Sequence, residues 1–191
     1  MKIYHFGIMV IFGLATACGR SPDSQFYILN PILPQQTHQK GYEHLRIGIN
    51  KIHRPDYMDK PQLIIHLANQ EVKLQEYHRW VESLAQNTQH VIEANLKALL
   101  PGAVLLSAPW DVKLKPDYQL QIDIQQFEVD INGASRLTAD YLIYSDNHLN
   151  KKGSLVYFKR ITPPSTINLV ATMNANLTQF TRDLAKILIK L

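Results

Sequence analysis

The 191-residue sequence has only one cysteine, Cys18, which excludes an intramolecular disulfide framework, a cysteine-based zinc finger and a CxxC redox pair. It also lacks the GxxxxGK(S/T), GxGxxG, HExxH and GxSxG motifs. The residues that a phosphate-binding loop, a zinc protease site or the nucleophile elbow of a hydrolase requires are therefore missing. Charged residues make up 19% of the chain, and the net charge of +4 comes from scattered cations, which is no signal for nucleic acid. We therefore expect neither an enzyme nor a metal or cofactor site.

The chain also lacks a hydrophobic run long enough to cross a membrane, which takes about 20 apolar residues. Its longest apolar stretch, residues 3–14, follows Lys2 and precedes the small residues Ala15 to Ala17. This order is typical of an export signal that is removed from the mature protein. We expect a signal peptide over residues 1–17, cleaved between Ala17 and Cys18.

The residues before Cys18 resemble the bacterial lipobox, although the usual Leu or Val three residues before the cysteine is Ala15 here. The resemblance implies a diacylglycerol on the Cys18 thiol and an acyl chain on the new amino terminus, with residues 18–24 as a lipidated tether. An aspartate directly after the lipidated cysteine would favour retention in the inner membrane. This position holds Gly19 instead, so we expect the outer membrane. The alternative is a soluble exported protein with an incidental Cys18, but a free thiol is a liability in an oxidising compartment.

Hydrophobic residues make up 46% of the sequence, enough to fill the core of one domain over residues 25–191. Short apolar or alternating runs predict strands, and a loop bracketed by Pro55 and Pro61 separates two of them. Ser83 is a plausible N-cap for an amphipathic helix that Pro101 and Gly102 end. The strands predicted in this half are residues 26–29, 45–52, 62–67, 72–77 and 104–106.

Residues 118–131 change hydrophobic phase in the middle of one predicted strand. Apolar residues fall on even positions as far as Ile124 and on odd positions from Phe127, so we expect a β-bulge near Gln125 and Gln126. Asn132-Gly133 predicts a two-residue hairpin turn. Strands over residues 137–144 and 155–161, separated by a polar loop, and a helix over residues 166–190 follow. The pattern predicts an α+β domain, a mostly antiparallel sheet with two helices packed on it.

Three residues are candidates for contact with a partner. Arg79 and Trp80 lie in a segment, residues 77–80, that is rich in the residue types of interface hot spots, and Tyr57 lies in the loop between the prolines. We expect Tyr57, Arg79 and Trp80 to cluster at one end of the sheet. The alternative is that Trp80 caps the junction of sheet and helix, with Arg79 outside.

Several segments resemble one family, the ABC-type transport auxiliary lipoproteins, which includes the C subunit of the Pqi intermembrane transport system. Residues 24–29 resemble its opening strand and residues 54–63 its proline- and tyrosine-containing signature. Residues 76–84 are similar to its EFHRWAEPL segment, with Ser83 in place of the proline. The resemblance implies an outer-membrane lipoprotein that faces the periplasm and works beside MCE-domain proteins and an inner-membrane permease in moving lipid.

Two functions remain open at this point. The domain is either a docking subunit for an MCE-domain partner, or a periplasmic carrier that holds lipid in an apolar pocket. A carrier needs an apolar cavity of at least several hundred Å³. A docking subunit needs an exposed recognition surface on a filled core. Both predicted helices have the apolar stripe of a helix that packs into a core, which favours the docking subunit.

Overall fold

The structure, a computed structural model, describes residues 22–33, 41–68, 70–111 and 113–191. The predicted signal peptide, its cleavage site at Ala17 and Cys18, and Asn69, between the predicted strands 62–67 and 72–77, lie outside these residues. Within the described ranges, no helix combines the length and apolarity that a membrane crossing requires.

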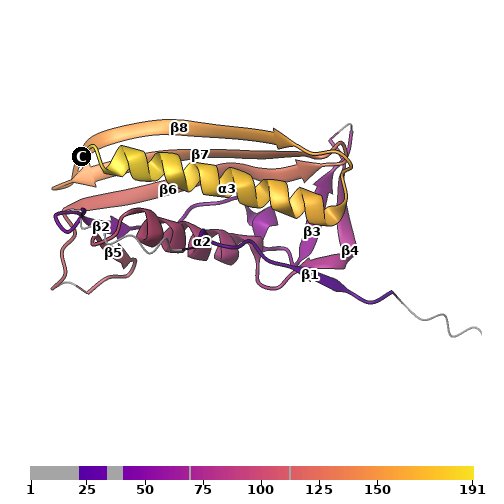
Figure 1. The fold of residues 1–191 in the computed structure, drawn as a ribbon, viewed down its shortest axis with the longest axis horizontal. Helices are drawn as coiled ribbons and strands as arrows, with labels where there is room; N and C mark the ends of the chain where they lie inside the picture. The colour runs from indigo at the N-terminus through magenta and orange to yellow at the C-terminus, as the bar shows by residue number, and fades with distance from the viewer. Residues whose placement is uncertain (1–21, 34–40, 69, 112) are drawn as a thin grey trace, which may run out of the picture.

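Two helices and a sheet of eight strands make up the described residues, which confirms the α+β class. Figure 1 labels the elements. In chain order they are β1 (Gln25–Tyr27), β2 (Arg46–Ile49), the 3-10 helix η1 (Asp56–Asp59), β3 (Gln62–His66), β4 (Val72–Trp80), α2 (Leu84–Leu99), β5 (Val104–Ser107), β6 (Tyr118–Asp130), β7 (Ala134–Ser145), β8 (His148–Arg160) and α3 (Thr166–Leu188).

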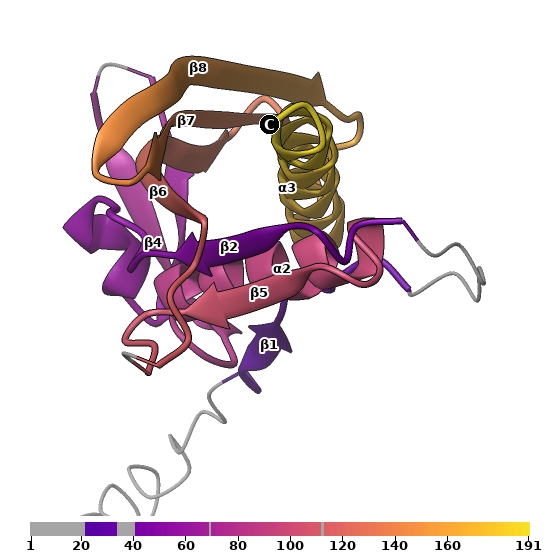
Figure 2. The ribbon, with the colours of Figure 1, turned by 90° about the vertical axis from the view of Figure 1, so that its left-hand side faces the viewer.

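The sheet is mixed, and β6 is its central strand. The long ladders, β3–β4, β6–β7 and β7–β8, are antiparallel. Four shorter pairs are parallel: β1–β4, β2–β5, β2–β6 and β3–β6. The first residues of β6 pair with β2, and its last residues pair with β3. In chain order, η1 lies in the connection between β2 and β3. Figure 2 shows the sheet curving from β8 past β6 to β2 and β5, with α3 on its open side.

Both helices form where their sequences favour them. The Ser83 hydroxyl accepts a hydrogen bond from the Gln86 N–H at 3.2 Å, so the predicted N-cap of α2 is confirmed. The apolar stripe of α3 is buried against the sheet and against α2, with Phe180 and Leu177 inaccessible to solvent. The core therefore lies between the two helices and the concave side of the sheet.

The hairpins differ in part from the sequence expectation. The predicted bulge is confirmed, since the register shifts between Ile124 and Gln126. The two-residue turn at Asn132-Gly133 is wrong: the Asp130 carbonyl accepts from the Gly133 N–H at 3.1 Å, and Gly133 alone has a positive φ there, at 84°. A longer loop with a glycine in the left-handed region results.

The polar loop predicted between the last two strands is also wrong. Asp146 and Asn147 have φ angles of 47° and 65°, which makes them the two central residues of a tight turn of type I′. The strand β8 then begins at His148 and pairs with β7 along its whole length. The first half of β8 is polar and carries no strand pattern of its own. Its strand geometry comes from the hydrogen bonds that it makes with β7.

The segment after β1 is held in the groove between α2 and α3 by asparagine side chains. Three backbone N–H groups donate to asparagine oxygens: Leu29 to Asn87 at 2.6 Å, Asn30 to Asn174 at 2.7 Å and Ile32 to Asn95 at 2.8 Å. This segment pairs with no strand. The bond at Leu29 is buried and that at Ile32 is partly buried, so Asn87 and Asn95 satisfy backbone groups that burial would otherwise leave without partners, whereas the bond at Asn30 is exposed. These contacts fix where the chain leaves the domain toward its amino terminus.

Candidate docking surface

Tyr57 lies at the edge of the core. It belongs to η1, is half-buried, and its hydroxyl accepts a hydrogen bond from the Phe127 backbone N–H at 2.9 Å, just after the bulge of β6. Burial raises the pKa of Tyr57, the Phe127 hydrogen bond lowers it, and the nearby Glu128 carboxylate raises it again. The phenol stays neutral and fastens η1 to the bulged strand, which is a structural role.

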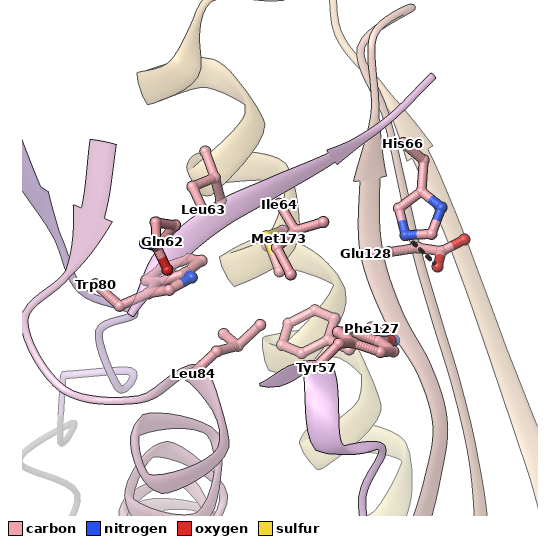
Figure 3. A pocket seen from close by; sticks show the side chains of 10 residues that line it. All are labelled: Tyr57, Gln62, Leu63, Ile64, His66, Trp80, Leu84, Phe127, Glu128 and Met173. Carbon is pink, nitrogen blue, oxygen red and sulfur yellow. Dashed lines mark hydrogen bonds and ion pairs between the residues drawn. The ribbon is translucent and has the colours of Figure 1, made fainter. Parts of the chain in front are cut away.

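Trp80 is a core residue. Only 5% of its surface is exposed, so its ring is not offered at the surface of the domain, and the alternative of a cap at the sheet–helix junction fits its position. Figure 3 shows Trp80 and Tyr57 on different sides of one small hollow, which Leu84, Phe127 and Met173 also line. The cavity volume is about 20 Å³. A cavity of this size holds about one water molecule.

Arg79 lies on the other side of β4. It is opposite Phe26 of β1 and Gln62 of β3 in the ladders, and because successive strand residues face opposite ways, it points away from the core that contains Trp80. Its Nε is buried and has no hydrogen-bond partner among the described residues. Thus Tyr57 and Trp80 share a hollow, while Arg79 is separated from them by the sheet.

Two histidines of the described residues, His66 and His90, have acidic partners. His66 Nε2 lies 2.9 Å from the Glu128 carboxylate, across the β3–β6 pair. His90 pairs with Glu82 at 3.2 Å, whereas Glu93 accepts from Gln89, so the spacing of His90 and Glu93 on α2 does not bring them together. Within the described ranges, no three histidine, cysteine or acidic side chains are grouped as metal ligands.

The larger hollows of the described surface are open and polar. One of about 380 Å³ is lined by residues such as Arg46, Lys115 and Asp146. Another of about 320 Å³ is lined by Lys51, Arg54 and residues of α2. Acyl chains require apolar walls that bury most of the ligand surface. These hollows do not provide such walls, and the apolar hollow beside Trp80 is too small.

The sequence analysis missed an exposed aromatic and arginine cluster on the outer face of the sheet. Phe158 of β8 is 55% exposed, and the guanidinium carbons of Arg136 and Arg160 lie 5.8 and 5.7 Å from the centre of its ring. At these distances each cation is attracted to the ring face. Residues 155–158 are apolar on both strand faces, a pattern that is equally typical of a strand buried on both sides, so the sequence alone does not identify the exposed face.

The chain belongs to the ABC-type transport auxiliary lipoprotein component family, whose sequence profile matches residues 27–185. Members of this family are auxiliary lipoproteins of a transport system, and the family is not a catalytic one. The expected family is therefore confirmed. No curated protein is similar enough to this chain to count as a relative.

Two crystal structures share the fold. One, of an uncharacterized protein, is 17% identical, with a TM-score of 0.71 over 86% of this chain and 98% of its own. The other, of a protein from Xanthomonas campestris, is 16% identical, with a TM-score of 0.68 over 85% of this chain and 93% of its own. The PelC dodecamer from Paraburkholderia phytofirmans is more distant, at 10% identity and a TM-score of 0.46, over 73% and 86% of the chains.

Proposed function

We propose that this chain is a non-catalytic, lipid-anchored subunit of the outer membrane that docks an MCE-domain partner of an intermembrane lipid transport system. Family membership supports the auxiliary role in transport. The observation that carries the choice of docking over carrying is the small size of the apolar hollow among the described residues. The apolar hollow encloses about 20 Å³, far below the several hundred Å³ that a lipid chain needs.

The partner contact is proposed on the outer face of the sheet around Phe158. Aromatic and arginine side chains dominate the binding energy of protein interfaces, and Phe158 is exposed with Arg136 and Arg160 beside it. The two guanidinium groups hold the ring in place before binding, which reduces the entropy that the partner must offset. This surface replaces Tyr57 and Trp80, whose side chains serve the fold, while Arg79 stays a separate candidate for the contact.

The test measures the affinity of the mature chain for the periplasmic region of its MCE-domain partner. Truncation at a hot spot costs about 2 kcal/mol or more, so Phe158→Ala is expected to raise the Kd by about 30-fold or more. Arg79→Ala tests the expectation from the sequence. Val104→Ala is the control because Val104 is 40% exposed on β5, the edge strand far from β8.

Three results are informative. A loss with Phe158→Ala alone supports the docking face on β8. Parental affinity of Phe158→Ala places the contact elsewhere, and a loss with Arg79→Ala would then move it to the outer side of β4. If the unmodified chain does not bind the MCE-domain region at all, docking is not its function.

A further inference from the structure

Exposed apolar side chains surround the point where the chain leaves the domain toward its amino terminus. Phe26 and Val81 are each 62% exposed, and Ile28 is 44% exposed. Their neighbours Leu29 and Trp80 are buried. This alternation places Phe26, Ile28 and Val81 on the outer side of β1 and of the end of β4.

These three residues form one patch, which we call the β1 patch. Phe26 is paired with Arg79 in the parallel ladder, and Val81 follows two residues later. The Val81 N–H donates to the Tyr27 carbonyl at 3.0 Å, between Phe26 and Ile28 in the chain. Large apolar side chains exposed together mark a contact surface more often than isolated ones do.

The position of the β1 patch is fixed relative to the rest of the domain. Leu29, directly after Ile28, donates to the buried Asn87 side chain, and Asn30 and Ile32 donate to asparagines of α3 and α2. In both ribbon views β1 lies on one side of the molecule and β8 on the opposite side (Figures 1 and 2). The strand that carries most of the patch therefore lies on the opposite side of the molecule from the strand that carries Phe158.

The length of chain before the patch identifies what it meets. Only seven residues lie between Cys18 and Phe26, so the two are eight residue steps apart. Even a fully extended segment of eight residues spans at most about 28 Å. If Cys18 carries the lipid, as the proposed function requires, the β1 patch cannot leave the immediate neighbourhood of the bilayer. A short tether also keeps the local concentration of lipid high, so a small patch suffices.

We propose that the β1 patch rests on the membrane that holds the Cys18 lipid, with Phe26, Ile28 and Val81 inserted at the boundary of headgroups and acyl chains. Apolar and aromatic side chains bind this boundary in proportion to the apolar area that they bury. The contact adds a second attachment to the lipid anchor and sets the orientation of the domain. It turns β1 toward the bilayer and leaves the Phe158 surface facing the periplasm.

The test places an environment-sensitive fluorophore in the patch of the lipidated chain. Because Cys18 is the only cysteine and its thiol would be acylated, Val81→Cys provides a single reactive thiol. Val156→Cys is the matched control, since Val156 is 64% exposed and lies on the outer face of β8. Both proteins are reconstituted in vesicles of phosphatidylethanolamine and phosphatidylglycerol, at a surface density so low that copies rarely meet. Lipids with a spin-labelled headgroup act as quenchers.

We expect strong quenching of the label at position 81 and none at position 156. Replacing Phe26 and Ile28 with serine in the Val81→Cys background should restore much of the emission, whereas Phe158→Ser should leave the quenching unchanged. Thermal melting equal to that of the parent shows that each labelled variant is folded.

Three other results would overturn the proposal, and each has a distinct signature. If the chain floats with the vesicles but the label at position 81 is not quenched, the lipid on Cys18 attaches the chain to the membrane while the β1 patch faces water. If the fluorescence at position 81 changes only as the surface density rises, a second copy covers the patch. If the chain does not float, Cys18 is not the anchor, and the proposed function fails in this respect together with the membrane contact.

Discussion

The asparagine contacts that hold the segment after β1 are tested most sharply at Asn87. Its side chain is 3% exposed, accepts from the Leu29 N–H at 2.6 Å and donates to the Leu29 carbonyl at 3.2 Å. Asn87→Ala leaves both backbone groups of the buried Leu29 without partners. Each unsatisfied buried group costs about 1–3 kcal/mol, so for the two groups we expect a loss of about 2–6 kcal/mol in the free energy of unfolding.

This loss is measurable by thermal unfolding. For a domain of this size, 1 kcal/mol shifts Tm by about 2–4 °C, which gives a decrease of about 4–24 °C for Asn87→Ala. Asn174→Ala is the control, because its bond to the Asn30 N–H is exposed and water replaces it at a cost of about 0.5–1.5 kcal/mol. Hydrogen exchange at the Leu29 amide should also become faster in Asn87→Ala. Equal and small losses in the two variants would refute the claim that these contacts fix the segment.

Three further predictions concern the hairpin, the anchor and one carboxylate. Gly133→Val is expected to destabilise the domain by at least about 1–3 kcal/mol in urea unfolding, since Gly133 has a φ of 84° and an added Cβ would clash with the Ile161 carbonyl oxygen. Gly41→Ala, where nothing lies within 4 Å of the added Cβ, should have little effect, and equal losses would contradict this reasoning. Cys18→Ser should abolish metabolic palmitate labelling, and unchanged labelling would rule out Cys18 as the anchor. Hydrogen bonds from Lys186, Gln179 and Tyr157 lower the pKa of Asp183 in the folded chain, so its contribution to stability is present above its unfolded pKa and is lost as the pH falls below about 4. The difference in unfolding free energy between the parent and Asp183→Asn should therefore be larger at about pH 7 than at about pH 3, and a difference independent of pH would contradict the assignment.

The sequence predicts those elements whose signal is local. The change of phase between Ile124 and Phe127 requires an extra residue, because strand side chains alternate strictly, and the bulge is found there. The helix α2 has its N-cap at Ser83 and its stop at Pro101, so both ends can be predicted from short-range chemistry. The long apolar stripe of α3 is equally independent of its neighbours.

The features that depend on a neighbouring strand could not be predicted in this way. The first half of β8 is polar, and its strand geometry comes from its ladder with β7 after the Asp146–Asn147 turn. The parallel pairing of β1 with β4 joins residues about fifty positions apart, and neither strand carries a sign of its partner. Local alternation predicts that a strand has two faces but does not identify the buried one.

The same limit explains the outcome at the candidate contact residues. The segment from Tyr77 to Trp80 has the composition of a hot spot, but the end of β4 turns Trp80 into the core and Arg79 away from it. Tyr57 carries no signal in the sequence for its bond to the Phe127 amide, since seventy residues separate them. Phe158 has an ordinary apolar strand pattern, and only the sheet shows that its face is exposed.

The central claim is that this chain docks a partner and does not itself carry lipid. Native mass spectrometry of the mature chain, alone and mixed with the periplasmic region of its MCE-domain partner, tests this claim most directly. We predict a complex with the partner, and a free chain whose mass includes the covalent lipid on Cys18 and no other lipid. A free chain that retains one non-covalently bound phospholipid and forms no complex would contradict the account.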